Sequence, residues 1–177
     1  MKKFKEFTNL LETPLMNDYL SKDKMDLLAN HTKQRITSST SPESKIDNFY
    51  HKVVDGDHMY YTKNNEGVNS VSVISPDNIH LFTHKGSEPA SQIHSFMTHH
   101  AEKHGQIKTD LNNTEGSKKL WTTLIKSKPV NKSFHMTNPD IQDKISIDHN
   151  NIDSMSDKIW GKRSKFSDVK LVMTHHD

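Results

Sequence analysis

The sequence predicts a mixed α/β fold of the α+β type, with helices on the faces of a central, mostly antiparallel sheet. From residue 48 onward, four short runs rich in Val, Ile, Tyr and Phe alternate with turn-forming residues. A helix–strand–helix pattern follows over residues 87–129, and further short strand-like runs come after it. Strands on both sides of such a unit are typical of a single sheet covered by helices.

Residues 1–47 predict an N-terminal helical arm and a linker. Residues 1–12 place Phe4, Phe7, Leu10 and Leu11 on one helical stripe, and residues 21–31 form a second helical candidate. Residues 32–45 are rich in Ser and Thr, contain a proline and carry one large apolar residue, Ile36, so they predict a loop or linker. We therefore expect the folded α/β domain to span residues 48–177.

The first part of the domain predicts an antiparallel meander. Its strands are expected at residues 49–54, 58–63, 68–74 and 79–84. Asp55-Gly56 and Asn65-Glu66-Gly67 are the residue types that hairpin turns require, because they tolerate a positive φ.

The middle of the chain predicts a helix, a strand and a second helix. Ser87 is an N-cap candidate for the first helix, Pro89 is tolerated in its first turn, and Gly105 is a C-cap candidate. Residues 106–110 are extended, and Thr114 caps a second helix that Lys128-Pro129 ends. Helical spacing predicts buried faces at Ile93, Phe96, Met97 and Ala101, and at Ser117, Leu120, Trp121, Leu124 and Ile125.

The end of the chain predicts strands at residues 133–137, 144–147 and 169–174, with a short helix at 154–160. We expect strands 79–83 and 107–110 to be parallel neighbours, joined by a right-handed crossover through the helix at 90–104.

Composition excludes several classes of site. The 177 residues include no cysteine, so disulfides, thiolate zinc sites and cysteine nucleophiles are excluded. The formal charge of +2 indicates no strongly basic face for nucleic acid. Because no apolar run approaches the roughly 18 residues of a membrane span, and the N-terminus lacks the apolar core of a secretory signal, we expect a soluble intracellular protein.

One motif carries a family resemblance. The pattern Asp110-x-x-Asn113-x-x-x-Ser117-x-x-Leu120-Trp121-x-x-Leu124 resembles the second half of N-acetyltransferases of the GNAT superfamily. In that family a strand leads into an Asn-x-x-Ala-x-x-Leu-Tyr helix beside the acyl-CoA. In this register the family's Asn falls on Thr114, one residue after Asn113. The order of elements from residue 48 to residue 176 is also that of the family, so the resemblance implies a GNAT-like fold.

The resemblance also implies where acetyl-CoA would bind in an active enzyme. Lys85, Gly86 and Ser87 would contact the pyrophosphate at a helix N-terminus, while Asn113 and Trp121 would line the cleft.

Three residues depart from what that chemistry needs. Glu88 adds a negative charge, Pro89 removes an N–H donor, and Trp121 replaces the tyrosine that serves as the family's acid. We therefore expect no cofactor and assign no catalytic residue.

The histidines do not predict a metal site from the sequence alone. His100 and His104 are four residues apart on one predicted helix, a spacing that ligands can use. A chain with 13 histidines produces such spacings by chance, and no His-Glu-x-x-His motif occurs. The expectation from the sequence is no metal.

The N-terminal twelve residues carry a second resemblance. MKKFKEFTNLLE is similar to the capsid-targeting leaders of internal head proteins in large tailed phages, which are cut after a Leu/Ile-x-Glu site. The equivalent cut here would fall between Glu12 and Thr13, with Pro14 as a departure just beyond it. The alternative is a plain amphipathic helix that packs on its own domain.

These patterns favour a phage-encoded, virion-associated or protein-interaction protein on a degenerate acetyltransferase-like fold. One alternative is an active N-acetyltransferase that uses acetyl-CoA. Another is a host-takeover or anti-defence inhibitor that binds a bacterial protein. In each non-enzymatic case the expected partner is a protein, and the expected location is the host cytoplasm during infection or the virion.

Overall fold

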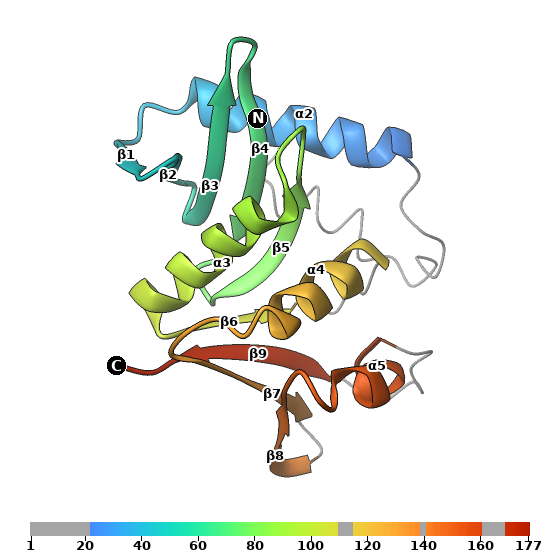
Figure 1. Ribbon diagram of the computed structural model, residues 1–177. Helices are drawn as coiled ribbons and strands as arrows, with labels where there is room; N and C mark the ends of the chain where they lie inside the picture. The colour runs from blue at the N-terminus through green and yellow to red at the C-terminus, as the bar shows by residue number, and fades with distance from the viewer. Residues whose placement is uncertain (1–21, 110–114, 139–140, 161–168) are drawn as a thin grey trace.

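The computed structural model describes residues 22–109, 115–138, 141–160 and 169–177, which form four helices and a nine-stranded sheet. The first elements are α2 (Lys22–Ser38), β1 (Glu43–Ile46), β2 (Phe49–Val54), β3 (Asp57–Asn64), β4 (Gly67–Ile74) and β5 (Ile79–His84). They are followed by α3 (Ala90–His104), β6 (Gln106–Thr109), α4 (Glu115–Lys126), β7 (Lys132–Asn138), β8 (Ile141–Ile147), α5 (Ile152–Trp160) and β9 (Lys170–His175). The strands lie in the order β1-β2-β3-β4-β5-β6-β9-β7-β8 (Figure 1).

Strands β1 to β5 form the predicted antiparallel meander, with one strand more than expected. The turn between β2 and β3 is Asp55-Gly56, with φ angles of 54° and 90°, and Val54 pairs with Asp57 across it. Two consecutive residues with positive φ give the tight hairpin that Asp-Gly favours. This turn fixes the register in which His51 lies opposite Tyr60.

The parallel neighbours are β5 and β6, as the sequence predicts. Ile79 pairs with Lys108 and His80 with Thr109, and α3 is the connection between the two strands. This parallel ladder is short. Beyond His80, residues 82–84 of β5 pair with β4, for example Thr83 with Ser72.

The last strands complete the sheet out of sequence order. β9 lies between β6 and β7 and is antiparallel to both, and β8 forms a hairpin with β7. The chain therefore forms one continuous mixed sheet, antiparallel except at β5–β6.

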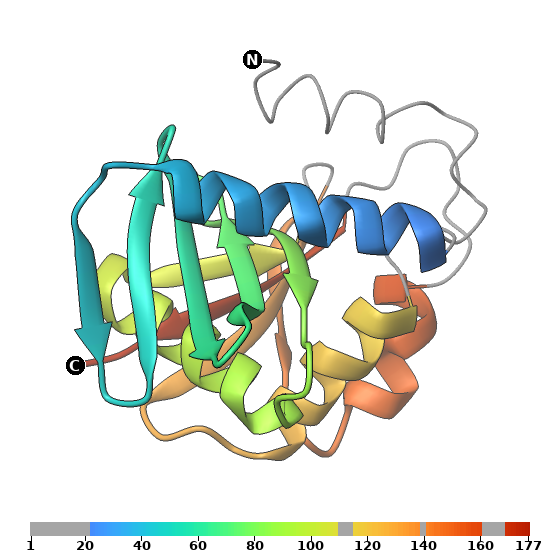
Figure 2. The same ribbon diagram turned by 90° about the horizontal axis from the view of Figure 1, so that it is seen from above.

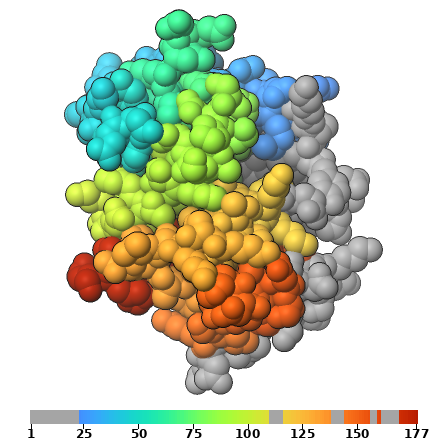
Figure 3. Space-filling model, viewed as in Figure 1, coloured from blue at the N-terminus to red at the C-terminus, as the bar shows by residue number. Residues whose placement is uncertain are grey.

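The helices cover opposite faces of this sheet. Helix α2 crosses β2 to β5 on one face, whereas α3, α4 and α5 lie on the other (Figures 1 and 2). The space-filling view shows α3, α4 and α5 adjoining one another on their face (Figure 3). The sheet has a hydrophobic core on each face, and alternate side chains of β3 contribute to each of them. Met59 and Tyr61 face α2, while Tyr60 faces α3.

The prediction of a loop or linker at residues 32–45 is wrong. Helix α2 continues to Ser38, and β1 pairs with β2 through Glu43↔Lys52 to Ile46↔Phe49. Ile36 is buried, and Arg35 donates to the carbonyl oxygen of Val54 and to the carboxylates of Asp55 and Asp57, each at 3.2 Å. These long-range contacts stabilise a helical end with few apolar residues.

The start of α3 also differs from the prediction. The N-cap residue is Pro89, with φ −69° and ψ 157° and no side-chain capping bond, so Ser87 is not the cap. Gly105 is the C-cap with φ 81°, as predicted. The predictions for residues 1–12, Asp110, Asn113 and Thr114 lie outside the described residues.

Within the part of the chain that the structure describes, no helix has both the length and the apolar character that a bilayer span requires.

Candidate functional site

The loop before α3, residues 85–89, is the place where the resemblance puts a cofactor. Its conformation is set by Asn69 on β4. The Asn69 side-chain amide donates to Ser87 Oγ at 2.9 Å and to Glu88 Oε1 at 3.0 Å, and its oxygen accepts the Ser87 N–H at 3.3 Å. Asn69 is buried whereas Ser87 is exposed, so these bonds are partly shielded from solvent.

Gly86 fits this loop because it lacks a side chain. Its φ is 59°, and a Cβ atom there would lie 2.6 Å from both the backbone oxygen and the Oδ1 of Asn69. Only glycine allows this backbone approach without displacing Asn69. The loop is therefore packed directly onto β4.

Glu88 points toward the sheet. Its Oε1 accepts hydrogen bonds from Thr62 Oγ1 and from Asn69 Nδ2, each at 3.0 Å. Thr62 in turn shares a 2.8 Å hydrogen bond with Ser70 Oγ. The carboxylate is thus part of a polar network between the loop and strands β3 and β4.

Beside this network, His80 and Trp121 are buried where the parallel ladder ends. His80 Nε2 lies 2.6 Å from Thr83 Oγ1 and 3.1 Å from Ser72 Oγ, and burial lowers the pKa of His80 to about 4. The imidazole is therefore neutral at pH 7.

Trp121 is fully buried, as predicted, with its ring centroid 6.5 Å from that of His80. Its indole Nε1 is buried without a hydrogen-bond partner among the described residues. The indole is a donor with no acidic proton at neutral pH, so Trp121 packs in the core and has no acid chemistry to offer.

A second polar site lies at the opposite end of α3 and contains five histidines. The hairpin β2–β3 supplies His51 and His58, while the last turns of α3 supply His99, His100 and His104. The rings lie close together: those of His100 and His104 are stacked with centroids 4.3 Å apart, and those of His58 and His104 meet edge to face with centroids 4.5 Å apart. Within the described residues, His58, His100 and His104 form a group whose ligand nitrogens lie within 4.8 Å of one another.

Hydrogen bonds hold the buried His100 and the half-buried His51 and His58. His100 Nε2 lies 2.9 Å from Asn78 Oδ1, and His100 Nδ1 lies 3.0 Å from the hydroxyl of Tyr60. His51 Nε2 and His58 Nδ1 share a hydrogen bond of 3.1 Å.

The electrostatics of the cluster favour neutral rings. Burial and then the neighbouring histidines lower the pKa of His51 to about 4 and that of His100 to about 3. Burial also lowers the pKa values of His58 and His104. At pH 7 the cluster therefore presents uncharged imidazoles with available lone pairs.

An open cavity adjoins the cluster. Its volume is about 610 Å³, and it lies between the β1–β2 turn, the β2–β3 hairpin and the end of α3. His51, His58, His99 and His104 line it together with Asp47, Lys45 and Lys103.

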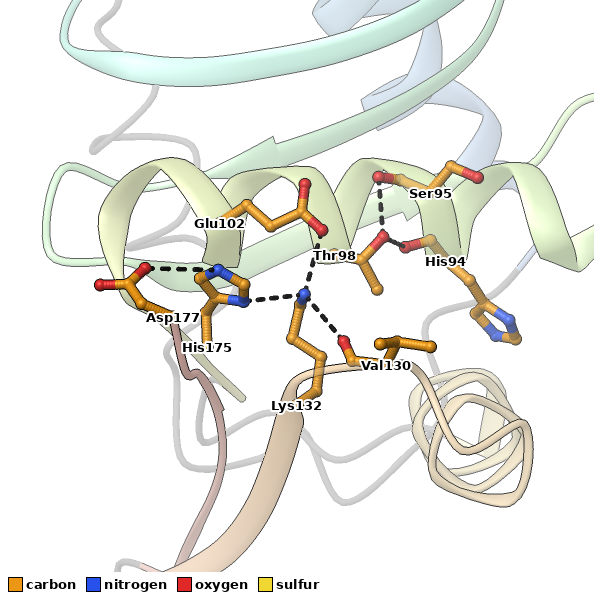
Figure 4. A network of polar contacts seen from close by, with 8 residues as sticks. All are labelled: His94, Ser95, Thr98, Glu102, Val130, Lys132, His175 and Asp177. Carbon is orange, nitrogen blue, oxygen red and sulfur yellow. Dashed lines mark hydrogen bonds and ion pairs between the residues drawn. The ribbon is translucent and has the colours of Figure 1, made fainter.

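A buried lysine links the same end of α3 to strands β7 and β9. Lys132 Nζ donates to Glu102 Oε1 and to His175 Nδ1, each at 3.0 Å, and to the carbonyl oxygen of Val130 at 3.3 Å (Figure 4). The Lys132 side chain is 2% exposed, whereas Glu102 is 47% exposed. The network joins α3 to β7 and β9, and it keeps the C-terminal turns of α3 in place.

Of the residues that the resemblance groups for a cofactor, four lie in the described part of the chain. Lys85, Gly86 and Ser87 lie on an exposed loop, whereas Trp121 is in the core. Asn113, Glu12 and Thr13 lie outside the described residues.

The sequence shows the helical spacing of His100 and His104, but their third partner, His58, comes from another element. The Asp55-Gly56 turn was the available signal, because a two-residue hairpin places His51, His58 and Tyr60 on one face.

Comparison of the chain with protein-family models, curated proteins and solved structures finds no match.

Proposed function

We propose that this chain is a GNAT-like domain without acetyl-CoA chemistry, and that it acts as a phage virion-associated or protein-interaction protein. The order of elements supports the first part. A meander, a crossover helix between parallel strands, a second helix and closing strands follow one another from β2 to β9. This is the order that the resemblance implies.

The main support for the absence of acetyl-CoA chemistry is the loop before α3, residues 85–89, which is packed onto β4 and is called the closed loop below. Binding of a pyrophosphate at a helix N-terminus requires backbone N–H groups that face the ligand and no opposing charge. Here the Ser87 N–H donates to Asn69, Pro89 has no N–H, and the Glu88 carboxylate lies beside the same loop. Of the groups that would hold the cofactor, the Ser87 N–H and hydroxyl already have an intramolecular partner, the Oδ1 of Asn69.

The absence of an acid at Trp121 supports the same conclusion. A general acid must lie within hydrogen-bond reach of the leaving thiolate. Trp121 is 0% exposed and its ring packs against His80, so its position serves the core.

An acetyl-transfer assay tests the enzymatic alternative. Release of free CoA from acetyl-CoA is followed in the presence of a polyamine, a lysine peptide and an aminoglycoside as acceptors. The proposal predicts no release above the protein-free background, for the wild type and equally for Trp121→Tyr, which restores the phenol of the family. Acceptor-dependent release by the wild type would contradict the proposal.

The interaction role is tested on phage particles. If residues 1–12 act as a capsid-targeting leader, mass spectrometry of purified virions should detect the chain with a new N-terminus at Thr13. The double variant Phe4→Ser, Phe7→Ser should be lost from virions, whereas the control Thr8→Ala should be packaged. A chain absent from virions that co-purifies with one host protein would instead support the inhibitor alternative.

A further inference from the structure

We propose that His58, His100 and His104 bind one transition-metal ion of the Zn²⁺, Ni²⁺ or Cu²⁺ class. The three ligand nitrogens lie within 4.8 Å of one another and come from two elements, β3 and α3. Imidazole is a preferred ligand of these ions, and three histidines with an open position form a known type of zinc site. This inference is independent of the proposed function, because it concerns the other end of α3.

Helix α3 and the β2–β3 hairpin hold the three histidines in position. His100 and His104 are one helical turn apart on the same face of α3, with ring centroids 4.3 Å apart. His58 is held in register by the Val54↔Asp57 hairpin, and its ring lies 5.1 Å from that of His100. The Lys132 network keeps this end of α3 against the closing strands.

The hydrogen bonds around the rings are those that metal-bound histidines use. A ligating histidine usually donates its second N–H to a carbonyl oxygen or another acceptor. Asn78 Oδ1 accepts from His100 Nε2 at 2.9 Å, which leaves the lone pair on Nδ1. His58 Nδ1 and His51 Nε2 share a hydrogen bond, and in the tautomer where His58 Nδ1 is the donor the lone pair lies on His58 Nε2.

Binding requires a small closure of the cluster. Metal–nitrogen bonds of about 2.1 Å place tetrahedral ligands roughly 3.4 Å apart, closer than the 4.8 Å limit observed. His104 is exposed, so its side chain can rotate inward. The Tyr60 hydroxyl, now 3.0 Å from His100 Nδ1, must turn away from that nitrogen.

The bound ion would lie in the wall of the 610 Å³ cavity, because His58 and His104 both line it. A fourth coordination position would then face the cavity, where water or a small anion can exchange. Lys45 and Lys103 line the same cavity together with Asp47, so the positive charges outnumber the single carboxylate and favour an anion there.

Titration with Zn²⁺, followed by calorimetry, is the primary test, with Co²⁺ absorption as a spectroscopic readout of the ligand geometry. The wild-type chain should bind one ion per molecule, and Zn²⁺ should raise the melting temperature until a chelator is added. His104→Ala should weaken binding at least 100-fold. Because His104 is exposed, this variant is expected to fold, and circular dichroism of the metal-free protein checks that it does.

Two further variants test the neighbouring groups. Asn78→Ala removes the acceptor for His100 and should weaken Zn²⁺ binding about 10- to 100-fold without removing a ligand. Tyr60→Phe removes the hydroxyl that competes for His100 Nδ1 and should strengthen binding. A merely structural role for Asn78 would not change the Zn²⁺ affinity.

The controls are the exposed His149 and the adjacent pair His175-His176, which is the obvious adventitious site. His149→Ala and His176→Ala should leave the stoichiometry and the affinity unchanged. Binding that survives His104→Ala, or that is lost in His176→Ala, would overturn the proposal. Failure to bind at 1 mM Zn²⁺ would also overturn it, because a Kd above 1 mM corresponds to a binding free energy of less than about 4 kcal/mol.

Discussion

At the residue scale, the burial of Trp121 shows whether the region at the end of the parallel ladder is a packed core or a binding cleft. The side chain is fully buried and contacts a neutral histidine, and its Nε1 has no hydrogen-bond partner among the described residues. A buried indole without a polar partner contributes through packing.

Trp121→Ala should therefore lower the free energy of unfolding by about 3–5 kcal/mol, the usual range for large aromatic truncations in a core. Urea denaturation followed by circular dichroism measures the change. A loss below about 1 kcal/mol would mean that the site is open to solvent in solution, and it would revive the binding-cleft interpretation.

His80 predicts a pH dependence of stability. Its pKa is about 4 in the folded chain because of burial, against 6.5 when unfolded. Between these values the unfolded state binds the proton and the folded state does not, so stability falls as the pH falls from 6.5 toward 4. Between pH 7 and pH 5, His80 alone should remove about 2 kcal/mol.

The variant His80→Gln isolates this contribution. Its amide can still bond to Ser72 and Thr83, but it cannot titrate. Urea unfolding at pH 7 and pH 5 should show a smaller loss for the variant than for the wild type, because the other histidines contribute equally to both. Equal losses would mean that His80 is not shielded from solvent.

At the element scale, the loop from Lys85 to Pro89 depends on one glycine. Gly86→Ala should destabilise the fold by more than about 1 kcal/mol, because the new Cβ would lie 2.6 Å from two atoms of Asn69 in addition to the strain of a positive φ.

Gly105→Ala is the matched control for this prediction. Gly105 also has a positive φ, 81°, but nothing lies within 4 Å of its Cβ position. Differential scanning calorimetry should place the melting temperature of Gly86→Ala below that of Gly105→Ala. The reverse order would show that the loop is not packed onto β4.

The elements that the sequence predicts well are those with strong local signals. The bounds of β5 match the predicted residues 79–84, and the Asp55-Gly56 turn has the expected φ angles. Each of these rests on residue types whose backbone preference is local, such as β-branched residues in strands and Asp-Gly in turns.

The elements that the sequence misses depend on distant partners. Strand β1 is mostly exposed and polar, and it exists because it pairs with β2 at the edge of the sheet. The last turns of α2 are held by salt bridges from Arg35 to Asp55 and Asp57. Lys52 also donates hydrogen bonds to the carbonyl oxygens of Ile36 and Ser39. Such contacts have no periodic signature.

The sequence does not predict the full histidine cluster, for the same reason. The helical spacing of His100 and His104 is visible in the sequence, but the third histidine lies more than forty residues earlier, on β3. Its position depends both on the hairpin register and on the packing of α3 across the meander. The first of these is local, whereas the second is tertiary.

At the scale of the whole molecule, a short parallel ladder joins two antiparallel regions into one sheet. The region β1–β5 has helices on both faces, and the strands β6, β9, β7 and β8 follow it beyond β5 (Figure 1). The two polar sites lie at opposite ends of α3. One is a loop closed onto β4, and the other is a group of neutral histidines beside a cavity.

The central claim is that the closed loop before α3, residues 85–89, does not bind acetyl-CoA. Calorimetric titration with acetyl-CoA tests this claim most directly. Because the Ser87 N–H is engaged, Pro89 has no donor and the Glu88 carboxylate lies beside the loop, we expect a Kd weaker than about 1 mM, or less than roughly 4 kcal/mol. A micromolar Kd, or bound CoA in contact with residues 85–90, would contradict this account and favour the acetyltransferase.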